Sequence, residues 1–353
     1  MKKLRILMIG AGNIANTHIA SYKKNKNAEI VAICDINEKR LNKTADLFNI
    51  EKRFTSLDEA LKNVEADAAD VCVWNCNHAK CTIDALNAGL HVMCEKPMAH
   101  STAEAEEMKK VADANGKLLM IGFVLRYFNE SQVAKEFIDS GDMGEIYYSK
   151  ATYLRRHGAP GGWFCDKERS GGGPVIDLGV HVIDHTRYLM GSPKPVSVYA
   201  ATFEKLGNRK NLKTAAAWIP EDAKEDDKCD VEDLATALIR YDNGAVTLLE
   251  TSYSINGEGT TTKELFGTKG GIKVTDGDLK MYMEMNDYMV DVKPVLTCLK
   301  DSASGFDREI NHFVDCCLNG TECQSTAEDG IVIMKILDAI YESAGTGHEV
   351  IIE

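Results

Sequence analysis

The chain contains 353 residues, of which 44% are hydrophobic and 27% are charged. This composition is typical of a soluble globular protein, and at ~100–200 residues per domain the length predicts two domains. It excludes a disordered or fibrous chain. The 54 acidic and 41 basic residues leave a formal net charge of −13, and such a negative field repels phosphate backbones and anionic lipid. We therefore expect no nucleic-acid partner.

No stretch reaches the ~18 consecutive apolar residues that a membrane-spanning helix requires. The N-terminal run Leu4–Ile9 is too short for the hydrophobic region of a signal peptide. We expect a cytoplasmic protein with no membrane partner. The 11 cysteines include no C-x-x-C pair, which predicts reduced and mostly buried thiols without structural disulfides.

The first third of the chain alternates strand and helix patterns. Leu4–Ile9 reads as a buried strand, a helical pattern follows from Asn13 to Lys24, and the apolar run Glu29–Cys34 ends at Asp35. The alternation continues with helices over 37–48, from 56, 78–88 and 101–115, and with strands over 68–74, 91–94 and 117–122. This order predicts a parallel, doubly wound sheet.

Beyond Gly122 the pattern becomes rich in strands. The expected strands cover 146–154, 196–203, 234–241, 245–253 and 262–266. Asp242-Asn243-Gly244 predicts a tight hairpin turn, so antiparallel pairing should dominate. We predict an α/β fold with two domains, a dinucleotide-binding domain over 1–122 and a second α+β domain over 123–353. The polar segment Glu204–Asp233 is read as a loop or insertion, either a solvated excursion or a lid over an active site or subunit contact.

The turn after the first strand carries a dinucleotide-binding pattern. Gly10 suits the tight turn, and Gly12 lets backbone N–H groups approach a pyrophosphate. The helix that begins at Asn13 and Ile14 directs its positive dipole end toward that charge. Ala15 supplies the small side chain that close packing between helix and strand requires.

Asp35 lies at the end of the second strand, about 20 residues after Ala15. Its carboxylate can accept hydrogen bonds from the ribose hydroxyls and repels a 2′-phosphate, which favours NAD over NADP. Arg40 lies five residues further on and could weaken this discrimination. The alternative is an exposed turn aspartate without a cofactor role.

Two further segments carry candidate catalytic groups. Lys96, before Pro97, ends a parallel strand at the edge where α/β sheets bind ligands, and a cis peptide bond between them would fix the direction of the amine. The stretch Gly171–Asp184 places Asp177 and His181 four residues apart on a helix that begins near Pro174. A carboxylate beside an imidazole suits the removal of a hydroxyl proton.

His185 lies four residues beyond His181 and is read as a structural histidine. A metal site formed by Asp177, His181 and His185 is conceivable, but no further carboxylate set supports it. We therefore predict no metal. The glycine triplet 171–173 is expected to allow close backbone approach to a ligand.

The order of these motifs resembles the Gfo/Idh/MocA family of NAD(P)-dependent sugar and cyclitol oxidoreductases over nearly the whole chain. The matching segments are 9–15, Asn75 with His78, 91–97, 171–184, 231–234, 267–271 and 327–330. The resemblance implies a Rossmann domain and a second domain with a large, open, mainly antiparallel sheet, with substrate between the nicotinamide and that sheet. Val73-Trp74 departs from the family's Thr-Pro, which puts the contacts of the nicotinamide ring there in doubt.

The same resemblance implies the roles of individual residues. His181 is the general base, Asp177 holds the substrate or His181, and Lys96 polarises the reacting hydroxyl. The cofactor contacts are expected from Gly10, Gly12, Asn13, Ile14, Asp35, Asn75, His78, Glu95 and Lys96. The substrate contacts are expected from Arg126, Arg156, His157, Trp163, Asp177 and His181. For the arginines, a surface cluster that caps a strand end is the alternative.

We predict an NAD-dependent enzyme that interconverts a secondary hydroxyl and a ketone on a sugar, glycoside or cyclitol. One alternative is a redox-neutral enzyme that oxidises its substrate transiently with bound NAD, as in glycoside cleavage or epimerisation. Another is a nucleotide-binding sensor without turnover, although Lys96, Asp177 and His181 would serve no purpose there. The resemblance and the β-rich second domain also suggest a homo-oligomer.

Overall fold

The computed structural model describes residues 3–207, 209, 212–213, 219–220, 223–224, 227–296 and 303–352. They form two compact units, Met1–Tyr127 with Ser302–Ile331 and Phe128–Asp301 with Val332–Glu353. The first unit thus includes the C-terminal segment 302–331. The domain limits proposed from the sequence have a single boundary after residue 122. Among the described residues, no helix combines the length and apolarity needed to cross a bilayer.

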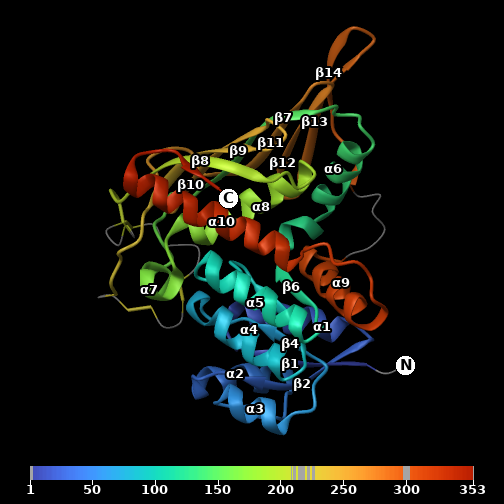
Figure 1. Cartoon of the computed structure of the whole chain (residues 1–353), viewed down its shortest axis with the longest axis vertical. Coiled ribbons are helices and arrows are strands. Elements are labelled where there is room, and N and C mark those ends of the chain that lie inside the picture. Colours follow the sequence, from blue (N-terminus) through green and yellow to red (C-terminus); the bar gives the residue numbers. More distant parts are fainter. Residues whose placement is uncertain are drawn as a thin grey trace. The chain divides into compact units, whose positions relative to one another are not determined.

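The first unit contains a six-stranded sheet in the order β3-β2-β1-β4-β5-β6, and every neighbouring pair is parallel. Figure 1 shows β1, β2 and β4 of this sheet. The strands are β1 Leu4–Ile9, β2 Ala28–Cys34, β3 Arg53–Phe54, β4 Ala68–Val71, β5 His91–Glu95 and β6 Leu119–Gly122. Their mostly buried residues are typical of a parallel sheet that is covered on both faces. The predicted Rossmann topology is confirmed.

Helices connect these strands, and one more comes from the C-terminal segment of this unit. They are α1 Asn13–Lys24, α2 Glu38–Phe48, α3 Leu57–Asn63, α4 His78–Asn87, α5 Thr102–Ala114 and α9 Gly305–Asn319, with short 3-10 turns η1 Asn75–Asn77 and η2 Val124–Tyr127. Polar side chains satisfy the first N–H groups of several helices. Asn37, Ser56 and Ser101 accept such bonds, and Ser304 with Asp307 forms a capping box at α9.

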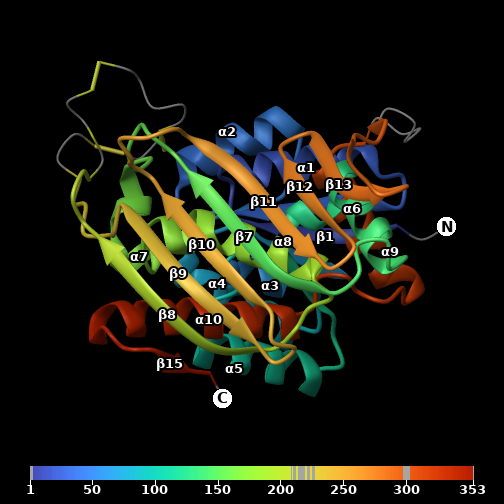
Figure 2. The same ribbon diagram turned by 90° about the horizontal axis from the view of Figure 1, so that it is seen from above.

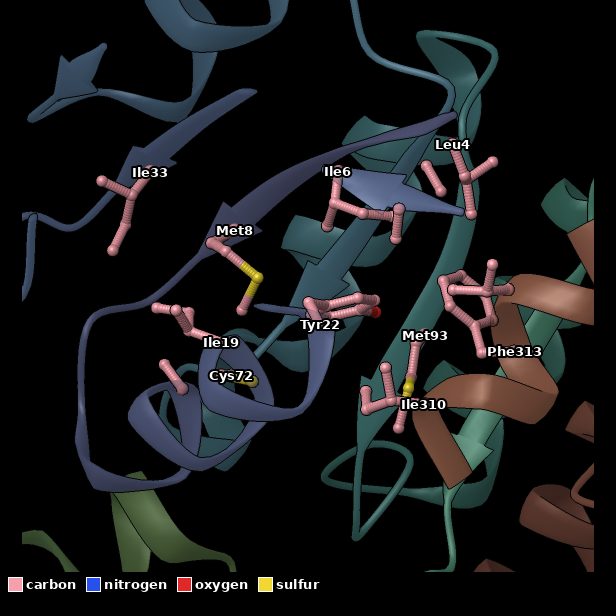
Figure 3. Packing of buried hydrophobic residues seen from close by; sticks show 14 of the residues in the cluster. Leu4, Ile6, Met8, Ile19, Tyr22, Ile33, Cys72, Met93, Ile310 and Phe313 are labelled. Atoms are coloured by element: carbon pink, nitrogen blue, oxygen red, sulfur yellow. The ribbon is translucent and has the colours of Figure 1, made fainter. Parts of the chain in front are cut away.

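The core of the first unit joins segments that are distant in the chain. Figure 3 shows Ile6 and Met8 of β1 beside Ile19 and Tyr22 of α1. Side chains of α9 lie on the same cluster, close to Leu4 and Met93; these are Ile310 and Phe313. Burial of such side chains stabilises a fold by ~1.5–3 kcal/mol each, so α9 is an integral part of the nucleotide-binding unit.

The second unit is built on a nine-stranded sheet in the order β14-β13-β12-β11-β7-β10-β9-β8-β15 (Figure 2). Its strands are β7 Ile146–Leu154, β8 Pro195–Phe203, β9 Leu234–Tyr241, β10 Val246–Ser252, β11 Thr260–Gly267, β12 Gly270–Thr275, β13 Asp278–Met285, β14 Tyr288–Val292 and β15 Val350–Ile351. Neighbours are antiparallel except β7 and β10, which run parallel with Leu154 opposite Ser252. The predicted mainly antiparallel sheet is confirmed.

The second unit also contains helices. They are α6 Asn129–Asp139, α7 Lys167–Ser170, α8 Val180–Leu189 and α10 Ala327–Thr346, whose first residues belong to the first unit, with η3 Gly162–Cys165 and the π-helical turn η4 Val175–Gly179. α8 packs against β7 and β11, and α6 packs against β12. Alternate residues of β9 are buried, which is typical of a sheet with one covered face.

Most expected strands lie within two residues of the observed ones, and the predicted hairpin between β9 and β10 has Gly244 at φ +85°. The expected strand 68–74 is wrong in its second half, because β4 ends at Val71 and the chain turns into η1. Part of the polar segment 204–233 lies outside the described residues. Its described ends meet at Asp233, whose carboxylate accepts the N–H groups of Lys205, Leu206 and Gly207.

Candidate active site

The turn between β1 and α1 uses its two glycines for different purposes. Gly10 has φ +105°, and a Cβ atom there would lie 2.2 Å from the carbonyl oxygen of Cys72. Gly12 has an ordinary φ of −77°, and a Cβ atom there would meet no protein atom within 4 Å. Asn13 is exposed and Ile14 is half-buried at the start of α1. The turn therefore leaves room for a pyrophosphate at a helix N-terminus.

Asp35 follows β2 and organises the neighbouring turn. Its Oδ2 accepts the N–H of Ala11 at 2.9 Å, and its Oδ1 accepts the N–H of Asn37 at 2.8 Å. Arg40 donates to both oxygens, from Nε at 3.0 Å and from Nη2 at 2.9 Å. Asp35 is thus fixed by the chain itself, and a bidentate arginine offsets its charge. The fixed position and the reduced charge of Asp35 both affect how its carboxylate would interact with a ribose.

The turns that follow β4 and β5 are held together by His78. Its Nδ1 lies 2.7 Å from the carbonyl oxygen of Pro97, and its Nε2 lies 3.2 Å from that of Val73. Burial lowers the pKa of His78. Asn75 is buried and begins η1, and the Lys96–Pro97 peptide bond is cis. His78 is 1% exposed, so it contributes to the shape of the two turns that follow β4 and β5.

A buried charge cluster lies at the end of β5, and the sequence patterns do not reveal it. His18 of α1 is fully buried, with its Nδ1 2.9 Å from Oδ2 of Asp70 and its Nε2 3.1 Å from Oε1 of Glu95. Burial opposes the charged imidazolium, but Asp70 and Cys72 together outweigh this effect, so the pKa of His18 is raised well above its usual value. Oε2 of Glu95 accepts the N–H of Lys96 at 3.1 Å. The cluster therefore connects α1 to the residue before Lys96.

Asp177 belongs to the second unit and lies in the π-helical turn η4 rather than in a regular α-helix. Its Oδ2 accepts the hydroxyl of Tyr253 at 3.1 Å, and burial raises the pKa of Tyr253 well above its usual value, so this hydroxyl remains a donor. α8 continues from η4 and carries His181, which is half-buried. π-helical turns of this kind are frequent at functional sites.

Arg155 completes the surroundings of Asp177. Burial opposes its charge, but Tyr153 and Asp177 raise its pKa. Its Nη2 donates to the hydroxyl of Tyr153 at 2.9 Å. Arg155 and Tyr253 each follow one of the two parallel strands, directly after the paired residues Leu154 and Ser252. The carboxyl ends of β7 and β10 therefore bring both side chains to Asp177.

The start of η4 is fixed by Glu232, which is 5% exposed. Its carboxylate accepts the N–H of Gly173 at 3.0 Å, the N–H of Val175 at 3.1 Å and the hydroxyl of Tyr341 at 2.9 Å. A Cβ atom at Gly172 would lie 1.9 Å from the Tyr341 hydroxyl, and one at Gly173 would lie 2.3 Å from the carbonyl oxygen of Glu232. The expectation that these glycines admit a ligand is therefore corrected, because they admit the chain's own residues.

The candidate substrate residues have different placements. Arg126 is 1% exposed, and its Nη1 donates to the carbonyl of Gln324 and to Asp329. Arg156 and His157 are exposed, and Trp163 is half-buried and packs on Phe164. The burial of Arg126 favours a structural role, whereas the other three are accessible to a ligand.

Two groups among the described residues have metal-ligand geometry, His18 with Asp70 and Cys72, and His312 with Cys316 and Cys323. Neither includes Asp177, His181 or His185, and His185 is 1% exposed. The sequence motifs did not point to Tyr253 or Tyr341. Arg155 is visible in the sequence as the neighbour of Arg156 in a candidate substrate wall, and Glu232 as part of the segment 231–234 that resembles a family landmark.

The Rossmann sheet with its glycine turn is typical of a nucleotide-binding protein, and Asp177 and His181 lie in η4 and α8 of the second unit. Family models match it in both halves, as an oxidoreductase family with an NAD-binding Rossmann fold over residues 4–123 and as the GFO/IDH/MocA C-terminal domain over residues 131–273. The chain belongs to the Gfo/Idh/MocA family and is an NAD-dependent oxidoreductase that acts on CH–OH groups.

Two relatives and one solved structure illustrate the similarity. D-glucoside 3-dehydrogenase of Escherichia coli is 32% identical over 98% of this chain and 97% of that protein. Myo-inositol 2-dehydrogenase of Thermotoga maritima is 27% identical over 76% of this chain and 74% of that protein. A structure of levoglucosan dehydrogenase in complex with NADH has a TM-score of 0.87 at 23% identity and covers all of both chains. This last likeness supports the fold.

Proposed function

We propose that this protein oxidises a secondary hydroxyl of a sugar or a related polyol to a ketone, and that this hydroxyl is the one at carbon 3 of a glucoside. The 32% identity to D-glucoside 3-dehydrogenase over nearly the whole chain supports the substrate class. The observation that carries the reaction type is Asp177, which the hydroxyl of Tyr253 and the charge of Arg155 hold on a π-helical turn directly before His181.

In this proposal His181 takes the proton of the reacting hydroxyl, because an imidazole exchanges protons near neutral pH. Asp177 orients the substrate or the imidazole, and Tyr253 fixes the direction of its carboxylate. Lys96 donates a hydrogen bond to the hydroxyl whose proton leaves. Arg156, His157 and Trp163 contribute to substrate binding, while Arg126 supports the segment that contains Gln324 and Asp329.

The cofactor residues fit NAD on two observations. The space beside Gly12 is open, and Asp35 is held at the end of β2. Gly10, Gly12, Asn13 and Ile14 would hold the pyrophosphate, and Asp35 the ribose. Asn75, His78, Glu95 and Lys96 would shape the nicotinamide end. Bound NAD⁺ supplies the acceptor for the hydride.

The test offers a glucoside and its 3-deoxy analogue to the protein with NAD⁺ and follows NADH absorbance together with the keto product. We expect NADH with the glucoside and none with the analogue. His181→Ala and Asp177→Asn should lower kcat by ~10²–10⁴ while NAD⁺ still binds. Full activity of either variant would remove that residue from its role. A redox-neutral product without NADH would favour transient oxidation instead.

The oligomeric state is a separate part of this proposal. Tyr199 of β8 and Leu238 of β9 are cross-strand partners on one face of the sheet and are 52% and 45% exposed. Such apolar exposure supports a homo-oligomer formed through the sheet. Sedimentation of the wild-type protein against a Leu238→Lys variant tests it, since an oligomer of this kind should dissociate in the variant.

A further inference from the structure

A group of thiols near the C-terminal end of α9 has no part in the proposed reaction. Cys316 lies in the last turn of α9, and Cys323 follows in the segment after the helix. Their Sγ atoms and Nε2 of His312 all lie within 4.8 Å of one another. Cys316 is 8% exposed and Cys323 is half-buried. One buried thiol and one accessible thiol therefore face each other.

We propose that Cys316 and Cys323 form a reversible redox pair that closes to a disulfide by exchange with a small disulfide such as oxidised glutathione. A disulfide requires an S–S distance of about 2.05 Å, so closure needs the two sulfur atoms to approach by at most about 3 Å. The connection between them contains Gly320 at φ +71°, and Thr321 and Glu322 are exposed. Exposed backbone of this kind can adjust more easily than a packed helix.

The two thiols differ in reactivity. The hydrogen bond from Cys316 stabilises a thiolate on Cys323 against the effect of burial and lowers the pKa of Cys323 to about 5. The pKa of Cys316 is raised, because its proton is held between the two sulfur atoms. Thiolates are the attacking species in exchange. Cys323 is therefore the nucleophile and Cys316 the resolving thiol.

The reaction balances in two steps. The Cys323 thiolate attacks one sulfur of the small disulfide, the S–S bond breaks, and one small thiolate leaves. Cys316 then attacks Cys323 in the mixed disulfide, and the second small thiolate leaves with the proton of Cys316. The two cysteines are oxidised by two electrons, and the small disulfide is reduced to two thiols.

A metal ion suits this group less well. Nε2 of His312 accepts the N–H of Gln324 at 2.9 Å. A metal ligand must present that same lone pair, so the ion would have to displace a backbone hydrogen bond. A disulfide between the two cysteines does not require this lone pair.

The position of the pair connects it to the first unit. The segment after Cys323 supplies the carbonyl of Gln324 to Arg126, and the carbonyl of Ser325 accepts the N–H of Ile121 in β6 at 2.9 Å. The Ser325 hydroxyl lies 3.0 Å from the hydroxyl of Tyr127. Closure would therefore change a segment that is attached to the end of the Rossmann sheet.

The experiment treats the reduced full-length protein with oxidised glutathione, alkylates the remaining thiols and cleaves after Glu322, which separates Cys323 from the α9 cysteines. We expect fragments linked through Cys316 and Cys323. Cys316→Ser should stop at a glutathione adduct on Cys323, and Cys317→Ser, the matched control, should still close. A link through Cys317, or adducts on exposed Cys229 without reaction at Cys323, would overturn the proposal.

A second measurement uses the wild-type protein alone. The alkylation rate of Cys323 should be nearly constant from about pH 6 to pH 8, since the thiolate is already formed, whereas the rate for free cysteine, measured alongside, should rise about tenfold per pH unit. A parallel rise at Cys323 would contradict the assignment of the nucleophile.

Discussion

The turns after β1 and β2 of the first unit form the cofactor edge, the site proposed for NAD. This edge and the surroundings of Asp177 in the second unit are built in different ways. At the cofactor edge, Gly10, Gly12 and Asp35 lie within one βαβ unit of the chain. Around Asp177 the supporting residues are Arg155, Glu232, Tyr253 and Tyr341. These come from four separate segments of the chain.

This difference is physical. A phosphate site needs free N–H groups at a helix start, and a short turn supplies them by itself. An aspartate that acts in catalysis, the role proposed for Asp177, needs a fixed direction, which depends on packing against other elements. The first kind of site is local in the chain, and the second depends on the whole sheet. The two kinds should respond differently to mutation.

Substitution at the two glycines of the turn should give the largest contrast. Gly10→Ala places a Cβ atom 2.2 Å from the Cys72 carbonyl at φ +105°, so we expect a loss of several kcal/mol in the free energy of unfolding, on the order of 3 or more. Gly12→Ala meets no protein atom and should keep or slightly raise stability, by up to ~1 kcal/mol, but weaken NAD⁺ binding.

Denaturant unfolding measures the stability of both variants, and NAD⁺ titration measures their affinity for the cofactor. The Gly12→Ala protein acts as a folded control for the other variant. If Gly12→Ala bound NAD⁺ like the wild type, the open space beside this residue would not be the pyrophosphate site.

The difference between local and nonlocal sites explains which parts of the structure can be predicted from the sequence. The sequence predicts the order of elements in the first βαβ unit, because each element has its own signal along the chain. These elements are β1, the glycine turn, α1, β2 and Asp35. The hairpin at Gly244 is readable for the same reason. Asp177 and His181 are found because both lie on one short segment.

The rest depends on contacts between distant residues. Tyr253 has no motif of its own and meets Asp177 because the end of β10 lies against η4, where the Thr251 hydroxyl donates to the carbonyl of Pro174 at 3.0 Å. The glycines at 172 and 173 are visible in the sequence, but their neighbours Tyr341 and Glu232 are not. Arg126 looks like a ligand residue, while the burial of its side chain comes from the segment after α9. Patterns identify such residues without revealing their partners.

Substitution of Glu232 tests whether the surroundings of Asp177 depend on contacts between distant segments of the chain. Glu232→Ala leaves the N–H groups of Gly173 and Val175 without their acceptor, and each such group costs ~1–3 kcal/mol. We expect lower stability together with a lower kcat, since Asp177 lies two residues beyond Val175. Tyr341→Phe, the matched control, removes one hydroxyl and should cost about 1 kcal/mol. Equal effects of the two changes on unfolding and on turnover would contradict a role for the carboxylate in fixing η4.

The buried cluster at His18 tests whether the cofactor edge also has nonlocal support. The pKa of His18 is raised well above 6.5, so its contribution to stability is complete below that pH and is lost as the pH rises through the folded-state pKa. The stability difference between wild type and His18→Gln should therefore shrink from about pH 6.5 upward.

His78 supplies the control of opposite sign. Burial lowers its pKa below 6.5, so the stability that its neutral form provides is lost as the pH falls below that value. The difference between wild type and His78→Gln should shrink toward acid. Denaturant unfolding across this pH range distinguishes the two, and a flat difference for His18→Gln would mean that the imidazole carries no charge in the fold.

The smallest expected effect concerns Arg40, whose bidentate bond offsets the charge of Asp35. Arg40→Ala should increase the repulsion of a 2′-phosphate and lower the affinity for NADP severalfold relative to NAD, on the order of 1 kcal/mol. Lys39→Ala removes the same charge from the same helix without touching Asp35, so it separates this pairing from a general change of field. Titration of both cofactors against both variants decides the point. Equal shifts would show that cofactor preference responds to net charge, and a shift confined to Arg40→Ala would show that the local pair sets it.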